Sequence, residues 1–133
     1  MNFKPFSKTK YLWLTILITS IIAIILKSTY RQYVYTNQIN DFGIADASPN
    51  FFAGLVITLL YFTQNQKMTF KKYAFFALVG LIGYEIIQGS VFKNNFFDYR
   101  DIIASIIGVG FGYFVGLRLN SFFSNDTSHL LQQ

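Results

Sequence analysis

Residues Tyr11 to Leu26 read YLWLTILITSIIAIIL, sixteen residues without a charge, with Lys8 and Lys10 before them and Lys27 and Arg31 after them. A helix needs about 20 mainly apolar residues to cross a bilayer core, and this run reaches that length once its flanks are counted. A basic start before an apolar stretch also describes a secretory signal peptide. No small-x-small cleavage pattern follows near Lys27, and three more apolar runs come later in the chain. The run therefore predicts a transmembrane helix.

Three further apolar runs predict three further helices. They are PNFFAGLVITLLYFT from Pro49 to Thr63, YAFFALVGLIGYEIIQG from Tyr73 to Gly89, and IIASIIGVGFGYFVGL from Ile102 to Leu117. We expect an all-α, polytopic membrane protein that forms one four-helix transmembrane domain. The predicted helices cover about residues 11–27, 47–64, 73–89 and 101–118, and residues 120–133 form a polar tail that frays.

The second run is the weakest of the four, because fifteen residues could also form a re-entrant or interfacial segment. Its start is well marked. Ser48 can cap a helix, and Pro49 suits the first helical position, where its missing N–H has no intrahelical partner to lose. A helix that begins nearer Asp46 would be long enough to span.

The composition agrees with a membrane protein and excludes several classes of site. Hydrophobic residues make up 53% of the 133 residues and charged residues 13%, against roughly 25% charged in soluble domains. With no Cys and one His, in the polar tail at position 129, neither a disulfide framework nor a zinc site is expected. The net charge of +5 gathers beside the apolar runs, so no nucleic-acid partner is predicted. No catalytic residue, cofactor or metal site is predicted.

The distribution of Lys and Arg predicts the orientation, because the positively charged side of a membrane protein is normally cytoplasmic. Seven of these residues fall on one predicted face and four on the other, which places both termini in the cytoplasm. The first group is Lys4, Lys8, Lys10, Lys67, Lys71, Lys72 and Arg118, and the second is Lys27, Arg31, Lys93 and Arg100.

Glu85 is the most informative polar residue, because a carboxylate in an apolar helix is costly to insert and marks a functional site by default. Gln88 is three residues later and shares its helical face. The chain then returns to Asp98, Arg100 and Asp101 at the same predicted depth. We expect these five residues to converge on an outward-facing polar cluster that binds a headgroup, a cation or a substrate, or passes a proton.

A purely structural interpretation of the same residues is open. Asp98 can cap the last helix with Asp101 in its first turn, where acidic side chains meet the positive end of the helix dipole. Glu85 could pair with Arg100 and hold two helices together.

The last apolar run has a small residue at every fourth position, namely Ala104, Gly108, Gly112 and Gly116. Such a stripe lets another helix backbone approach closely. We expect that partner within the same chain, with Gly80 and Gly83 of the third run serving the same contact. A homo-oligomer through the glycine face is the alternative.

The segment YEIIQGSVFKNNFFDYRDIIASIIGVGFGYFVG, from Tyr84 to Gly116, resembles the VanZ-like family of small bacterial membrane proteins. That family shows Glu and Gln three apart at the end of one helix, then an aromatic-Asp pair, then another Asp that opens a helix rich in small residues. The matching positions are Glu85, Gln88, Phe97, Asp98, Asp101, Ala104, Gly108 and Gly112. Many members also carry Lys-x-x-His before the second helix, and here Asn50 stands roughly where that His would be.

The resemblance implies a bacterial cytoplasmic-membrane protein with a role in the cell envelope or in resistance to teicoplanin-type glycopeptides. From the residues themselves, a small ion- or proton-coupled transporter or channel subunit is the alternative function. A membrane enzyme that acts on a lipid headgroup is a third possibility, but the chain offers no defined nucleophile or metal set for it.

Overall fold

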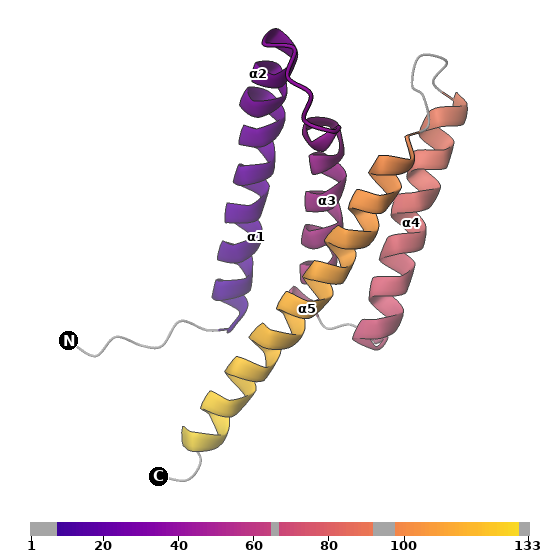
Figure 1. Cartoon of the computed structure of the whole chain (residues 1–133). Coiled ribbons are helices and arrows are strands. Elements are labelled where there is room, and N and C mark those ends of the chain that lie inside the picture. Colours follow the sequence, from indigo (N-terminus) through magenta and orange to yellow (C-terminus); the bar gives the residue numbers. More distant parts are fainter. Residues whose placement is uncertain (1–7, 65–66, 92–97, 131–133) are drawn as a thin grey trace, which may run out of the picture.

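The computed structural model describes residues 8–64, 67–91 and 98–130 and is entirely helical over them (Figure 1). Lys4, Lys93 and Phe97, which the charge comparison or the family motif used, lie outside these residues. Five α-helices are joined by one π-helical and one 3-10 turn. The elements are α1 (Lys8–Ile25), η1 (Leu26–Tyr30), α2 (Arg31–Thr36), α3 (Ile44–Leu59), η2 (Leu60–Thr63), α4 (Phe70–Val91) and α5 (Tyr99–Leu130).

The first predicted helix is longer than expected, because α1, η1 and α2 form one continuous rod. The widened turn η1 lies where two hydroxyl groups bond the preceding backbone. Ser28 Oγ donates to the Ile24 carbonyl at 2.8 Å, and Thr29 Oγ1 donates to the Ile25 carbonyl at 2.6 Å. The helix passes through this turn without a break and so carries α2 well beyond the apolar run.

Helix α3 begins at Ile44, so the expectation that Ser48 caps it at Pro49 is wrong. Gly43 occupies the N-cap position, and Asp41 caps the helix from two residues earlier. Its carboxylate accepts the N–H groups of Gly43 at 3.0 Å and Ala45 at 2.6 Å. Pro49 therefore lies inside the helix, where it removes the N–H that would bond the Ala45 carbonyl. Ser48 Oγ donates to that carbonyl at 3.3 Å. The earlier start makes the second helix long enough to span.

Helices α3 and α5 cross in close backbone contact, with α5 running diagonally over α3 in Figure 1. A Cβ added at Gly108 would overlap the Phe51 carbonyl, and one at Gly112 would lie 2.9 Å from the Leu55 carbonyl oxygen. On α3, a Cβ at Gly54 would lie 2.8 Å from the Ser105 carbonyl oxygen. The small residues on both helices thus permit this approach.

The glycine contact joins α5 to α3 rather than to α4. Gly80 and Gly83 of α4 have no atom within 4 Å of an added Cβ, so their expected packing role is wrong. Gly116 lies against the Phe62 ring of η2, and Ala104 is buried. The pattern identified the contact face of α5 but did not identify the helix that covers it.

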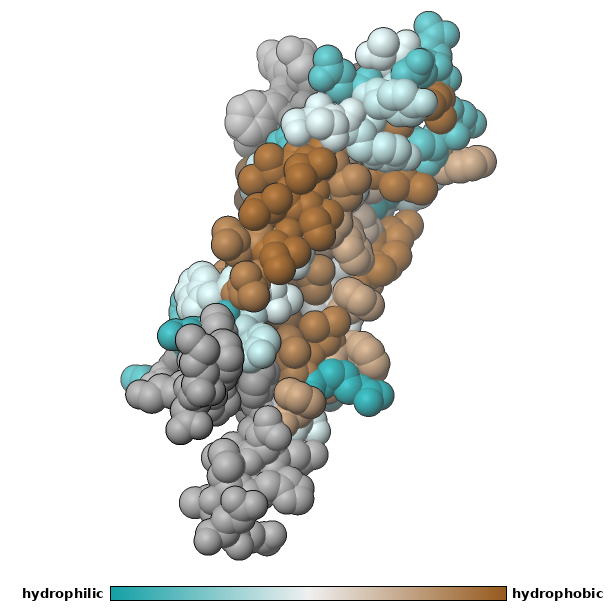
Figure 2. Space-filling view, turned by 90° about the vertical axis from the view of Figure 1, so that its left-hand side faces the viewer, coloured by the Kyte–Doolittle hydropathy of each residue, from teal (hydrophilic) through white to brown (hydrophobic). Residues whose placement is uncertain are grey.

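Three helical stretches are long and apolar enough to cross a membrane, namely Thr9–Thr36, Ile44–Thr63 and Tyr99–Phe122. Most of their large apolar side chains face outward, as lipid contact requires, and few are buried. Figure 2 shows the result as an apolar band between hydrophilic ends. The protein thus has the exterior of a membrane protein.

Helix α4 is 22 residues long and lies beside α5, but it is not among these three stretches. Lys71, Lys72, Glu85 and Gln88 make it more polar than the others. Helix α5 also differs from expectation, because it continues to Leu130 instead of ending in a frayed tail from Asn120.

An aromatic cluster ties the end of α3 to the start of α4 and the middle of α5. The Phe70 ring stacks on Tyr113 with centroids 4.4 Å apart and lies 4.4 Å from Phe62 and 4.9 Å from Tyr61. Tyr61 also donates its hydroxyl to the Met68 carbonyl at 2.9 Å. This end of the bundle is therefore closed by ring packing.

Candidate functional site

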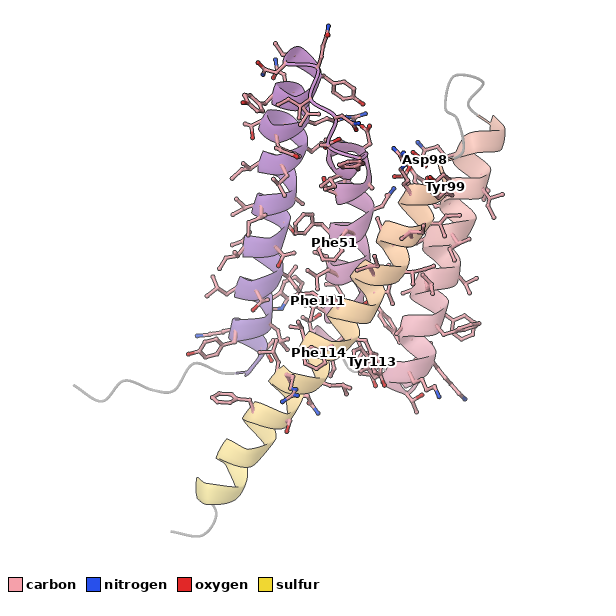
Figure 3. All side chains as sticks on the ribbon, in the orientation of Figure 1. Phe51, Asp98, Tyr99, Phe111, Tyr113 and Phe114 are labelled. Carbon is pink, nitrogen blue, oxygen red and sulfur yellow. The ribbon has the colours of Figure 1, made fainter. Side chains whose placement is uncertain are left out.

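Asp98 starts α5 at the opposite end of the bundle, where Figure 3 labels it beside Tyr99. Its Oδ1 accepts the Arg100 N–H at 2.9 Å, and its carbonyl accepts the Asp101 N–H at 3.1 Å. The predicted cap is confirmed. It holds the Asp101 side chain in the first turn of the helix, where the helix dipole favours a carboxylate.

Glu85 of α4 and Asp101 of α5 lie close enough for their charges to interact, and both are half-buried. The Asn50 side chain of α3 lies near both carboxyl groups. Three helices therefore meet at these three polar side chains. Two neighbouring carboxylates repel each other when both are charged, and a single amide cannot neutralise them.

Arg100 does not reach Glu85 but crosses to the connection between α2 and α3. A Cβ added at Gly43 would lie 3.0 Å from Arg100 Cδ, so the Arg side chain rests directly on this glycine. Gly43 has a φ of +83°, which glycine adopts without strain. The predicted alternative of a Glu85–Arg100 pair is not seen in this structure.

The ion pair that the described residues do form is Arg31 with Asp46, with Nε and Oδ1 2.9 Å apart and both side chains 42% exposed. The Tyr35 hydroxyl donates to the same carboxylate at 2.8 Å. Tyr35 and Asp46, with Asp41 and Arg100, line a hollow of about 380 Å³ above the start of α3. The Asp46 carboxylate in this hollow is paired with Arg31, and the Asp41 carboxylate accepts two backbone N–H groups.

Gln88 is half-buried on α4, and no hydrogen bond joins it to Glu85 or Asp101 in the described part of the chain. Of the five predicted residues, the structure thus brings Glu85 and Asp101 together. Asp98 is engaged in the helix cap, and Arg100 lies on the neighbouring connection.

Sequence reasoning did not assign two residues that the structure adds to this region, Asn50 and Ser105. Ser105 is 1% exposed, and its hydroxyl has no hydrogen-bond partner within the described residues; the same holds for Asp101 Oδ1. A signal for Ser105 was present, because it follows Asp101 by four residues and so lies on the same helical face. For Asn50 the family comparison marked the position, but only the packing of α3 brings it beside the carboxyl groups. We call Asn50, Glu85, Asp101 and Ser105 the polar junction.

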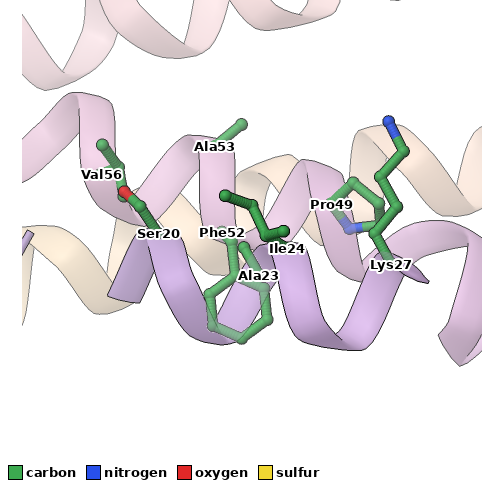
Figure 4. Close-up of a pocket in the computed structure, with 8 residues that line it drawn as sticks. All are labelled: Ser20, Ala23, Ile24, Lys27, Pro49, Phe52, Ala53 and Val56. Carbon is green, nitrogen blue, oxygen red and sulfur yellow. The ribbon is translucent and has the colours of Figure 1, made fainter. Parts of the chain in front are cut away.

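The remaining surface offers little polar chemistry. Over residues 8–64, 67–91 and 98–130, no three His, Cys, Asp or Glu side chains are grouped so that they could hold a metal ion. A hollow of about 300 Å³ lies between α1 and α3, with Lys27 at one end (Figure 4). Its other lining residues are Ser20, Ala23, Ile24, Pro49, Phe52, Ala53 and Val56. The lining of this hollow is mainly apolar, with Lys27 and Ser20 as its polar side chains.

Comparisons of the chain with models of known protein families, with curated proteins and with solved structures found no match.

Proposed function

We propose that this protein is a VanZ-like, four-span protein of the bacterial cytoplasmic membrane that acts at the outer face of that membrane through Glu85 and Asp101. The observation that carries the proposal is the meeting of these carboxyl groups beside Asn50, at the ends of three different helices. Carboxylates in membrane helices are costly to retain unless they have a role. At Asn50 the chain departs from the family pattern, because many members have a His roughly there.

The fourth span in this proposal is α4. Its 22 residues extend about 33 Å at 1.5 Å per residue, which matches a hydrocarbon core of about 30 Å. Lys71 and Lys72 lie at its first turn and Glu85 near its other end. Polar side chains near both helix ends can reach the headgroups, which reduces the cost of burying α4 in lipid.

The proposed orientation follows from the same arrangement. The starts of α1 and α4 lie at one end of the bundle, and the starts of α3 and α5 lie at the other (Figure 1). The first turn of α4 holds Lys71 and Lys72, whereas the first turns of α3 and α5 hold Asp46 and Asp101. The positive-inside rule then assigns the basic end to the cytoplasm and the acidic end to the outside. An envelope component could reach the polar junction from that side.

The orientation can be tested with single cysteines, because the native chain has none. Cysteines at Asn37, Lys67, Asn94 and Ser124 are each exposed to a membrane-impermeant thiol reagent in intact cells. Labelling of Asn37 and Asn94 alone is expected. Labelling of Asn37 without Asn94 would place the acidic end of α4 inside and overturn the proposal.

The role of the carboxylates is tested in the native host, by measuring growth under teicoplanin and other envelope stress with Glu85→Ala and Asp101→Ala. We expect both variants to lose the phenotype that the wild-type gene confers. Asp46→Ala, which removes a carboxylate of the exposed ion pair, is the matched acidic control and should keep that phenotype. Unchanged phenotypes at normal protein levels would remove the functional role of Glu85 and Asp101.

An ion-coupled transporter or channel subunit is the second candidate, and the unpartnered buried oxygens of Asp101 and Ser105 are the observation that favours it. Such a protein would move an ion across a lipid vesicle that contains no other component. Ion flux in reconstituted vesicles that is lost in Glu85→Gln would select this candidate over an envelope-binding role.

A further inference from the structure

Two buried oxygen atoms of the polar junction, Asp101 Oδ1 and Ser105 Oγ, have no hydrogen-bond partner within the described residues. Most buried polar atoms in proteins are bonded to protein or to ordered water, so each unpartnered one calls for an explanation. Leaving such a group without a partner destabilises the folded protein. Because Asp101 Oδ1 and Ser105 Oγ lie on one face of α5, one missing ligand could explain why both lack a partner.

The Ser105 hydroxyl differs from other hydroxyls in these helices. Thr15, Ser28 and Thr58 each donate to the carbonyl four residues earlier, at 2.9, 2.8 and 2.7 Å. This back-bond is the usual solution for a hydroxyl in an apolar helix. Thr58, which is 0% exposed, matches Ser105 in burial and makes the bond, whereas Ser105 does not.

The geometry of α5 directs this hydroxyl toward the carboxyl groups. Side chains on a helix tilt toward its N-terminus, so Ser105 leans toward Asp101, one turn earlier on the same face. The Ser105 carbonyl faces Gly54 of α3, and Asn50 is one turn before Gly54. Ser105 thus lies one turn along α5 from Asp101, beside the part of α3 that is one turn past Asn50.

One basic side chain, that of Arg31, interacts favourably with Asp101, but its ion pair is with Asp46. Arg100 lies on Gly43. Asp98 and Asp46 add further negative charge near Asp101. The junction therefore combines excess negative charge with oxygen atoms that lack a partner.

We propose that Glu85, Asp101, Asn50 and Ser105 bind one sodium ion between α3, α4 and α5. This inference rests on the proposed function, because it names the ligand of the same carboxylates. All four side chains offer hard oxygen ligands, which suit a hard cation. Calcium takes 6–8 oxygen ligands, and the described residues hold no group of three acidic side chains for a divalent metal. Full burial of the two unpartnered oxygens favours a small bare ion over an organic ammonium group.

Sodium binding is tested on the purified full-length protein in detergent by its melting temperature, followed by intrinsic fluorescence. NaCl, KCl and choline chloride are compared at equal ionic strength. A ligand that binds only the folded state raises the melting temperature as its concentration increases. We expect a rise of about 3 °C or more in 100 mM Na⁺ over choline, and a clearly smaller one in K⁺. Equal melting temperatures in the three salts, or a response to Mg²⁺ or Ca²⁺ alone, would overturn the proposal.

Two variants locate the site. Ser105→Ala removes only the hydroxyl, so we expect it to fold and to need at least tenfold more Na⁺ for the same shift. Thr58→Val is the matched control, because it removes an equally buried hydroxyl that is already bonded; it should lower the melting temperature in every salt and keep the Na⁺ response. An unchanged Na⁺ response in Ser105→Ala would refute the site.

Direct binding of radioactive ²²Na⁺ to wild-type protein and to Asp101→Asn gives a second measurement. Binding by the wild type and loss of binding in Asp101→Asn is expected. If Asp101→Asn does not fold, binding by Ser105→Ala decides instead. A protein that does not bind Na⁺ would refute the sodium site but not the proposed topology or the envelope phenotype. Cysteine labelling that shows the opposite orientation of α4 would refute the outward role but not Na⁺ binding.

Discussion

The two ends of the helix bundle are held together in different ways. At one end, Phe62, Phe70 and Tyr113 pack ring against ring, and the Tyr61 hydroxyl has its acceptor. At the other end, the same three helices present Asn50, Glu85 and Asp101 to one another, with a carboxylate oxygen left unpartnered.

The aromatic residues at the first end stabilise the folded protein, whereas the half-buried carboxylates at the other end reduce its stability. Aromatic rings contribute apolar area and specific ring geometry with no desolvated charge. Two half-buried carboxylates of the same sign contribute neither. The aromatic end therefore has the composition of a structural contact, and the polar junction has that of a site.

The largest expected effect comes from breaking the contact that supports both ends. Gly108→Leu would drive a side chain into the Phe51 backbone and should destabilise the protein by about 3 kcal/mol. Gly110→Leu is the control, because an added Cβ there meets open space. Thermal unfolding of both variants in detergent measures the difference, and equal melting temperatures would show that α3 and α5 do not pack through this face.

At the aromatic end, Phe70→Ala removes a half-buried ring with several ring neighbours and should cost about 2 kcal/mol. Phe75→Ala, at a ring that is 61% exposed, should change stability by about 0.5 kcal/mol or less. The same unfolding assay compares the two. Similar losses would mean that ring packing is not what closes this end.

At the acidic end, Asp41→Ala removes the cap of α3 and should cost about 1 kcal/mol. Gln32→Ala, an exposed neighbour on α2, is the control and should be nearly neutral. Urea or thermal unfolding measures both. A neutral Asp41→Ala would show that the connection before α3 is held by other contacts.

The smallest change in stability is expected for Glu85→Gln in Na⁺-free buffer, and it tests directly whether Glu85 stabilises the fold. Removing one of two like charges should leave stability unchanged or raise it by a few tenths of a kcal/mol. Asp46→Asn should lower the stability by a few tenths of a kcal/mol, since it weakens an exposed ion pair with Arg31. A clear loss of stability in Glu85→Gln would assign Glu85 to the structural contacts.

Much of the secondary structure could be predicted from local sequence. The apolar runs located the helices, and the Asp98 cap of α5 followed from its position before a helical run. The start of α3 was misplaced because Ser48 and Pro49 imitate a helix start, whereas the actual cap, Asp41, precedes the apolar run by several residues. The candidate site was predicted in part, since Glu85 and Asp101 were identified but Asn50 was not assigned to them.

By itself, the sequence determined an all-helical protein with an apolar exterior, because hydropathy and helix signals act over a few neighbouring residues. It also marked the small-residue face of α5, because the four-residue spacing puts those residues in one row. Only the tertiary structure decided that α3 covers this face and that Arg100 turns to Gly43 while Asn50 joins the carboxylates. These contacts depend on how helices that are distant in the sequence cross. The crossing depends on how well the two helix surfaces fit together, and no single segment of the sequence determines that fit.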